Sequence, residues 1–108
     1  MIRPFLLFVG LLAFTFCHAQ TWNSFASVPN GFVSDHSLGF ALEGSGYLVA
    51  GQTPNGYSDN VYKYDPNSDT WSTLADFPGE ARGYTIGDTW NGEAWMGFGL
   101  GYNGAMND

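Results

Sequence analysis

Outside its first 19 residues, the sequence has no cysteine and almost no positive charge. The single cysteine is Cys17, so a chain processed after residue 19 could form neither a disulfide nor a thiol nucleophile. Loss of Arg3 would take the formal net charge from −7 to −8 and leave Lys63 and Arg82 as the only strong cations. Binding to nucleic acid or to an anionic membrane surface requires a basic patch, which two cations cannot build. We therefore expect neither partner.

The sequence also lacks helical periodicity joined to helix start and stop signals. Charged residues make up only 12% of the chain, whereas aromatic residues make up 18% and 15 residues are glycine. A disordered chain has the opposite balance of charge and aromatic content. This composition predicts an all-β fold of short strands joined by glycine-rich turns.

The N-terminal segment has the pattern of a secretory signal peptide. A basic start at Arg3 precedes an apolar run of 13 residues from Phe5 to Cys17, and small residues lie before Gln20. The run is shorter than the roughly 20 apolar residues that a membrane-spanning helix needs. Lipidation of Cys17 is disfavoured because Phe16 is too large for the preceding position. We predict a signal peptide over residues 1–19, cleaved after Ala19, and a secreted or periplasmic product without a membrane span.

Two parts of the sequence repeat at a spacing of 48–49 residues. The segment from Trp22 to Pro29 aligns with that from Trp71 to Pro78, at an offset of 49. The segment from Gly46 to Gly51 aligns with that from Ala94 to Gly99, at an offset of 48. A tandem unit of this length is typical of the four-stranded blades of a β-propeller.

The strands of each unit can be assigned from apolar runs and turn signals. In the first copy, Gly51 to Asp59 contains Pro54 and Asn55-Gly56, which predicts a loop. A third strand is expected to begin at Asn60, and Asp108 aligns with this position in the second copy. The strands expected from the pattern are Ser37 to Leu42, Tyr47 to Ala50, Asn60 to Tyr64, Trp71 to Leu74, Tyr84 to Thr89 and Glu93 to Phe98.

With these strands, the chain resembles the Kelch-repeat β-propellers, which include galactose oxidase. A Kelch repeat has an apolar strand that ends in two glycines, then a tyrosine, and a tryptophan after six intervening residues. The chain has Tyr64 and Trp71 at this spacing, and Gly51 after an apolar strand. It departs from the pattern at the second glycine, because we expect Gln52 to occupy that position. The resemblance indicates the fold far more strongly than any function.

The resemblance implies a division of the chain into four parts. Residues 1–19 are the signal peptide, and residues 20–31 are expected to supply the fourth strand that closes the last blade. Residues 32–80 form a first blade and residues 81–108 a partial second one. Since a closed propeller needs about four to eight blades, we expect the remaining blades to lie in a longer protein. The alternative is a small domain that oligomerises through Trp22 to Phe25 and the edge near Met106.

The stretch YDPNSDTW, Tyr64 to Trp71, permits two interpretations. Asp65, Asn67 and Asp69 alternate like the first ligands of a calcium loop, but Thr70 occupies the position that such a loop gives to glycine. The Asp box of sialidases does not fit either, because it would need aspartate in place of Pro66. A tight turn uses all of these residues, since proline fixes one φ angle and the polar side chains bond local backbone groups. We expect a turn and no metal.

Three residues are candidates for ligand binding. Asp35 and His36 precede the first strand, and their pairing could provide a base or a ligand; the alternative is an exposed loop histidine. Arg82 precedes the corresponding strand of the second copy. It could bind a ligand carboxylate through both nitrogens, or pair with Glu80 or Asp88 at the rim. One histidine cannot form a typical zinc or copper site without further ligands, so we expect no cofactor.

Function remains open among three classes. Kelch propellers mostly bind, so we expect a protein- or glycan-binding module rather than an enzyme; Tyr57 and Tyr102 would suit stacking on a sugar. The alternative is part of a carbohydrate-active enzyme that resembles the Kelch-type sialic-acid mutarotases. A copper enzyme resembling galactose oxidase is less favoured, because its tyrosine–cysteine cross-link needs a cysteine that the processed chain lacks.

Overall fold

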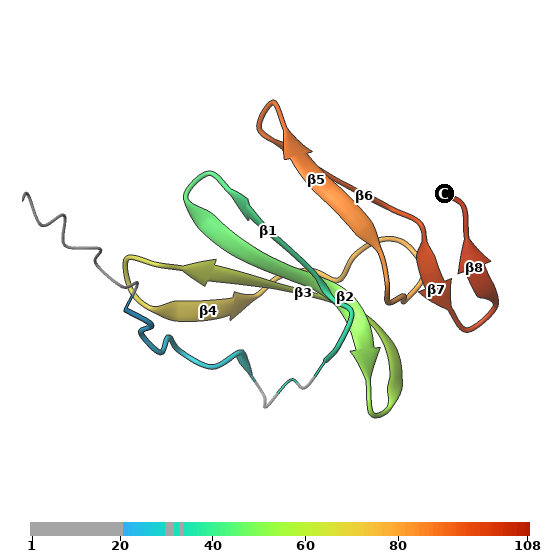
Figure 1. Cartoon of the computed structure of the whole chain (residues 1–108), viewed down its shortest axis with the longest axis horizontal. Helices are drawn as coiled ribbons and strands as arrows, with labels where there is room; N and C mark the ends of the chain where they lie inside the picture. The colour runs from blue at the N-terminus through green and yellow to red at the C-terminus, as the bar shows by residue number, and fades with distance from the viewer. Residues whose placement is uncertain (1–20, 30–31, 33) are drawn as a thin grey trace, which may run out of the picture.

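The computed structural model describes residues 21–29, 32 and 34–108, and its regular elements are all β-strands (Figure 1). The prediction of an all-β fold is confirmed. The predicted signal peptide lies outside the described residues. Among the residues that are described, no helix is long and apolar enough to cross a membrane.

The first unit is one antiparallel sheet of four strands in sequence order. These strands are β1 (Leu38–Leu42), β2 (Ser45–Thr53), β3 (Gly56–Asp65) and β4 (Thr70–Thr73). Each strand pairs with the next through a short connection, because polar and glycine residues interrupt the apolar runs. The order and the antiparallel pairing are those of a single propeller blade.

The predicted loop from Gly51 to Asp59 is wrong in extent, since β2 and β3 continue through most of it. Only Pro54 and Asn55 form the turn, closed by the pair Thr53 and Gly56. The Thr53 hydroxyl donates to the Gly56 carbonyl and accepts from the Asn55 amide, at 2.9 and 3.2 Å. The glycine at 51 signals a β-bulge inside the strand rather than its end.

The second unit contains β5 (Ile86–Trp90), β6 (Glu93–Gly97), β7 (Gly99–Gly101) and β8 (Gly104–Met106). They form two hairpins, β5 with β6 and β7 with β8. The first strand begins two residues later than predicted, because Tyr84 has a φ of 58° and lies in a bend, and Thr85 follows it outside the strand. The third strand of the unit begins at Gly104, earlier than the alignment of Asp108 with Asn60 predicts.

The two units repeat in backbone conformation as well as in sequence. Seven described residues of the first unit have positive φ, and for six of them the residue 48 positions later has a similar φ. The pairs are His36 and Tyr84, Glu43 and Asn91, Gly44 and Gly92, Ala50 and Phe98, Gly51 and Gly99, and Gly56 and Gly104. A period of 48 residues therefore describes the structure, and β6 with β7 corresponds to the single strand β2.

The units pack face to face, with β1 against β5 (Figure 1). A Cβ at Gly87 in β5 would lie 2.6 Å from the Leu38 side chain, so this glycine permits the close approach. The buried apolar residues Val49, Ala50 and Tyr62 all belong to the first unit. Phe32 packs against Tyr62 on the side of the sheet away from β5, with ring centroids 4.9 Å apart.

Candidate functional site

The stretch from Asp65 to Thr70 forms the turn between β3 and β4. The Asp65 carboxylate accepts hydrogen bonds from the Asn67 amide and from the Ser68 hydroxyl, both at 2.9 Å. These bonds lower the pKa of Asp65, with the Asn67 amide as the larger cause. Tyr64 and Trp71 are directly opposite each other across the two strands, and their ring centroids are 5.1 Å apart.

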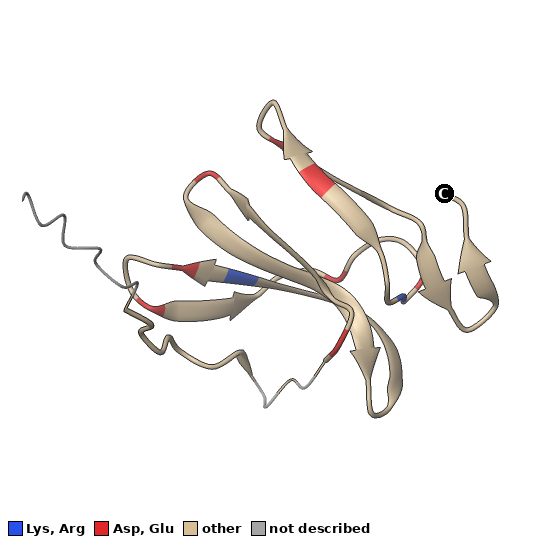
Figure 2. Ribbon diagram, in the orientation of Figure 1, with Lys and Arg blue, Asp and Glu red and all other residues tan. Residues whose placement is uncertain are grey.

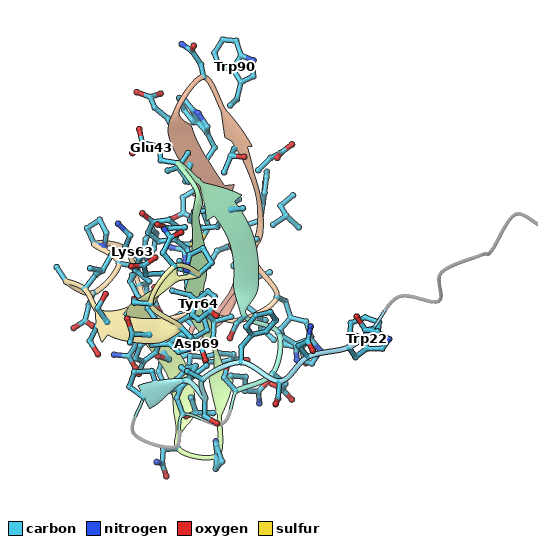
Figure 3. All side chains as sticks on the ribbon, turned by 90° about the vertical axis from the view of Figure 1, so that its left-hand side faces the viewer. Trp22, Glu43, Lys63, Tyr64, Asp69 and Trp90 are labelled. Atoms are coloured by element: carbon cyan, nitrogen blue, oxygen red, sulfur yellow. The ribbon has the colours of Figure 1, made fainter. Side chains whose placement is uncertain are left out.

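Asp69 in this turn binds the segment that contains Ala26, which precedes the first unit in the sequence. It accepts hydrogen bonds from the Ala26 amide at 2.8 Å and from the Tyr64 hydroxyl at 2.7 Å, and Figure 3 shows Tyr64 and Asp69 together. Both bonds lower the pKa of Asp69. Burial and the bond to Asp69 raise the pKa of Tyr64 to about 12. The Trp71 indole also donates to the Ala26 carbonyl at 2.8 Å.

Both carboxylates of the turn, Asp65 and Asp69, therefore accept hydrogen bonds from within the chain. The residue at the twelfth position of a calcium loop, Asp76, accepts from the Asn60 side chain at 3.1 Å instead of facing the turn. Across the part of the chain that the structure describes, no three His, Cys, Asp or Glu side chains gather as a metal site would require. The geometry of this stretch is that of a structural turn.

Figure 2 marks a cation in blue in the connection between the units. This residue, Arg82, is only 1% exposed. Its guanidinium binds the Asp108 carboxylate through both nitrogens, at 2.6 and 2.8 Å. It also donates to the carbonyls of Phe98 and Glu80, and stacks over Phe77. This pairing raises the pKa of Arg82 and lowers that of Asp108. Arg82 therefore binds a carboxylate through two nitrogens, as predicted for a ligand, but this carboxylate belongs to Asp108 of the same chain. The alternative partners, the Glu80 and Asp88 carboxylates, are not the ones that it binds.

Asp35 and His36 lie where the chain enters β1. An Asp35 carboxylate oxygen is 3.1 Å from His36 Nδ1, and both side chains are largely exposed. His36 stacks on Tyr84, with ring centroids 3.8 Å apart and planes inclined by 23°. Because His36 and Tyr84 are equivalent residues of the two units, this stack joins their loops at one end of the blades. The structure brings Asp35 and His36 together with Tyr84. The Arg82 side chain does not join this cluster, because it binds Asp108.

A cavity of about 300 Å³ adjoins this cluster. It is lined by Ser34 and Asp35 from the entry to β1, and by Gln52, Thr53 and Pro54 from the end of β2 and the turn that follows it. Backbone bonds between Asp35 and Gln52, at 2.8 and 2.9 Å, hold these two segments together. The cavity and the stacked rings therefore share one loop surface.

Two tyrosines extend this end of the molecule. The Tyr102 ring meets the Tyr57 ring edge to face, with centroids 5.2 Å apart, and its hydroxyl accepts from the Tyr57 amide at 3.0 Å. Tyr102 is well exposed. The stacking residues expected from the sequence thus contact each other, with one ring still open to solvent.

Comparison with known proteins agrees with this geometry. The family profile described as the Kelch motif matches residues 47–78. The chain carries a Kelch motif. The solved structure of YjhT, a Kelch-type propeller, is 22% identical to the chain and superposes with a TM-score of 0.69. The match covers 77% of this chain and 25% of YjhT, so the chain spans a quarter of that protein's length. No curated protein matches the sequence.

The predicted Kelch-type propeller fold is confirmed, but the position of its glycine pair is corrected. Two successive positive-φ residues, the geometry that suits two glycines, occur at Ala50 and Gly51. Gln52 continues the strand opposite Tyr57 and needs no glycine. The chain therefore replaces the first glycine of the Kelch motif with alanine, and the second copy replaces it with Phe98.

The residue that sequence reasoning missed at the candidate site is Tyr84. The sequence pattern places it at the start of a strand, whereas it has positive φ, precedes the strand and stacks on His36. The 48-residue offset contains the signal that could have found it, because Tyr84 aligns with His36. Gln52 and Thr53 were missed because they were assigned to a loop.

Proposed function

We propose that this chain is an exported, Kelch-type binding module whose loop surface takes a protein or glycan ligand. The meeting of Asp35, His36 and Tyr84 from successive units carries this proposal. The cluster combines an exposed carboxylate, an imidazole and an aromatic ring beside a cavity of about 300 Å³. Loops on a rigid β scaffold are a usual place for such a site.

The chemistry of the cluster limits the ligand. Ten acidic residues against two cations outside the predicted signal give the surface a negative potential, and Arg82 already holds Asp108. A carboxylate ligand would have to displace Asp108 to reach that guanidinium. Neutral hydroxyl-bearing ligands and polar peptide groups are better suited, since Asp35 and His36 can exchange hydrogen bonds with either.

Titration of the isotope-labelled chain with a panel of neutral and acidic monosaccharides, followed by NMR, tests the glycan form of the proposal. Chemical-shift changes should concentrate at the amides of Asp35, His36 and Tyr84. The Asp35→Asn substitution should weaken the affinity for the sugar at least about tenfold. Glu43→Gln is the matched control, because Glu43 lies in the β1–β2 turn at the opposite end of the blade. Equal weakening by both variants, or shifts only outside the cluster, would contradict this site.

A carbohydrate-active enzyme is the second candidate, favoured by the 3.1 Å separation between Asp35 and His36 Nδ1. Such a pair can accept and return a proton, which is the requirement for opening and closing a sugar hemiacetal. Interconversion of anomers followed by NMR would support this function if the rate fell on His36→Gln. Binding without any such acceleration would leave the chain a binding module.

Export is the remaining part of the proposal and rests on residues 1–19. N-terminal sequencing of material collected outside the producing cell should begin at Gln20. Recovery of a chain that begins at Met1, or carries lipid on Cys17, would contradict it.

A further inference from the structure

Three asparagine–glycine pairs lie at hairpin turns within the residues that the structure describes. They are Asn55-Gly56 at the β2–β3 turn, Asn91-Gly92 at the β5–β6 turn and Asn103-Gly104 at the β7–β8 turn; Asn30-Gly31 lies outside the described residues. Asparagine before glycine is favoured in such turns, but it is also the sequence in which an asparagine side chain most readily loses ammonia. The reaction needs the glycine nitrogen to reach the side-chain carbonyl carbon of the asparagine, and the three turns differ in how far they permit this.

The glycine nitrogen is restrained by strand pairing in two of these three pairs. Gly56 is the first residue of β3 and Gly104 is the first residue of β8, and each is paired with the residue across its turn. Gly92 lies in the turn itself, between the last paired residues of β5 and β6. Its nitrogen can therefore move without the loss of a strand pair.

The Asn55-Gly56 pair is also held by its neighbours. The Thr53 hydroxyl accepts a hydrogen bond from the Asn55 amide at 3.2 Å and donates to the Gly56 carbonyl at 2.9 Å. Tyr102 of the second unit covers the same turn, since a Cβ at Gly56 would collide with its ring. The Asn55 side chain could reach the Gly56 nitrogen only if the turn moved against these contacts.

The other two pairs differ at the asparagine side chain. The Asn103 side-chain amide donates to the Glu80 carboxylate at 3.0 Å, so the carbon that would be attacked is tethered. Asn91 is exposed, and a Cβ added at Gly92 would meet no atom within 4 Å. Gly104 has equally open surroundings, so the tether and the strand pairing are what distinguish Asn103 from Asn91.

The exposure of the Asn91-Gly92 turn belongs to its place in the blade. The same turn of the first unit holds Glu43 and Gly44, 48 residues earlier, and both are exposed although the second unit packs against β1. Figure 3 shows Glu43 and Trp90, which mark the two turns, at the same end of the molecule. A unit packed on β5 in the same way would leave Asn91 open to water.

We propose that Asn91 is a deamidation site, which converts faster than Asn55 or Asn103 while the chain is folded. The Gly92 backbone nitrogen attacks Asn91 Cγ, and the side-chain nitrogen leaves as ammonia with the proton of the Gly92 amide. One water molecule then opens the resulting five-membered succinimide at either carbonyl. Opening at one carbonyl gives aspartate, and opening at the other gives isoaspartate, in which the main chain runs through the former side chain.

Both products alter the β5–β6 turn. Each adds a carboxylate two positions before Glu93, and isoaspartate also lengthens the backbone of the turn. Asn91 and Gly92 have φ values of 54° and 79°, which a tight two-residue turn requires. The longer backbone does not fit this geometry, so the tip of the hairpin loosens. The two restrained pairs lie at the other end of the blades, beside the candidate ligand site, which conversion of Asn91 leaves intact.

Peptide mapping by mass spectrometry, after mildly alkaline incubation of the folded chain, measures the three rates. Asn91 should convert at least about fivefold faster than Asn55 and Asn103, the factor expected where one hydrogen bond must first break. In denaturant the three rates should converge, because each pair is then an unrestrained asparagine–glycine sequence. Equal rates in the folded chain, or the same spread of rates in denaturant, would overturn the proposal.

Substitutions at the tether and at the site test the cause of the ranking. Glu80→Ala removes the acceptor of the Asn103 side chain and should raise the Asn103 rate about fivefold, whereas Glu80→Gln keeps an acceptor oxygen and should raise it less. Neither should change the Asn91 rate, and an equal rise at both positions would show general unfolding and overturn the local explanation. Asn91→Glu copies the turn of the first unit, and with it the earliest acidic species in ion exchange should disappear. Persistence of that species would contradict the assignment to Asn91.

Discussion

At the scale of single residues, Trp71 links the first unit to the segment before it. Its indole nitrogen donates to the Ala26 carbonyl at 2.8 Å, and its ring packs against Tyr64. Phe25 continues this aromatic group, with its ring centroid 5.8 Å from that of Tyr64. Loss of the indole would therefore remove both packing and the anchor of the segment.

We expect Trp71→Ala to lower the free energy of unfolding by about 3 kcal/mol, the low end of the range for large aromatic truncations. The low end applies because Trp71 is half-buried. Denaturant melts followed by circular dichroism measure this change. Ser72→Ala, on the opposite face of β4, is the control and should change stability by no more than about 0.5 kcal/mol. A loss below about 1 kcal/mol for Trp71→Ala would show that the indole is dispensable.

At the scale of elements, the bulge in β2 sets the shape of the first unit. Gly51 has a φ of 117°, which side chains other than glycine rarely adopt. A Cβ at this position would collide with the hydroxyl oxygens of Ser34 and Ser37, and would lie 3.0 Å from the Asp35 carbonyl. The bulge thus brings the candidate ligand residues close to the end of β2.

Gly51→Ala should destabilise the chain by about 1–3 kcal/mol, the range for a residue held in a sparsely populated backbone conformation. Thermal melts and the NMR shifts of Asp35 and His36 report stability and site geometry together. The control Gly39→Ala lies in a regular part of β1 with its nearest neighbour 3.9 Å away, and should be close to neutral. Unchanged NMR shifts of Asp35 and His36 in Gly51→Ala would show that the bulge does not determine the geometry of the site.

Elements of the fold were predictable where a local signal and a long-range repeat coincide. The spacing of Tyr64 and Trp71 and the 48-residue repeat indicated Kelch blades, and the fold is of that kind. Gly51 misled the assignment because a glycine in a bulge has the same local signal as a glycine in a loop. The His36–Tyr84 stack joins residues of separate units, and the partner of Arg82 is 26 residues away. Such contacts arise from packing between units, which local patterns do not specify.

At the scale of the whole molecule, Arg82 connects the two units. Its amide donates to the Ser58 carbonyl and its own carbonyl accepts from the Gly51 amide, at 3.1 and 2.7 Å, both in the first unit. Its guanidinium reaches Phe98 and Asp108 in the second. Arg82 therefore links the two units, because its backbone bonds the first unit and its side chain bonds the second.

We expect Arg82→Met to uncouple the units. Hydrogen bonds to a charged group contribute about 1.5–3 kcal/mol each, so stability should fall by at least about 2 kcal/mol. Hydrogen exchange should accelerate at β7 and β8 more than at β1 to β4. Lys63→Met removes the other cation of the described residues, which lies on β3 over the Tyr47 ring, and should leave this pattern unchanged. Uniform acceleration across both units would indicate global destabilisation instead.

The same contact predicts a dependence on acid. Because Arg82 holds the pKa of Asp108 below its unfolded value of about 3.9, its stabilisation is complete above that pH. It is lost as the pH falls through the lowered folded pKa.

Asp65 and Asp69 also have lowered pKa values, so acid sensitivity alone does not identify Asp108. The difference in stability between the parent chain and Asp108→Asn does identify it, since the other groups are common to both. Melts should show this difference constant from neutral pH down to about pH 5 and shrinking below about pH 4. A difference that stays constant into strong acid would mean that the charge of Asp108 does not hold the units together.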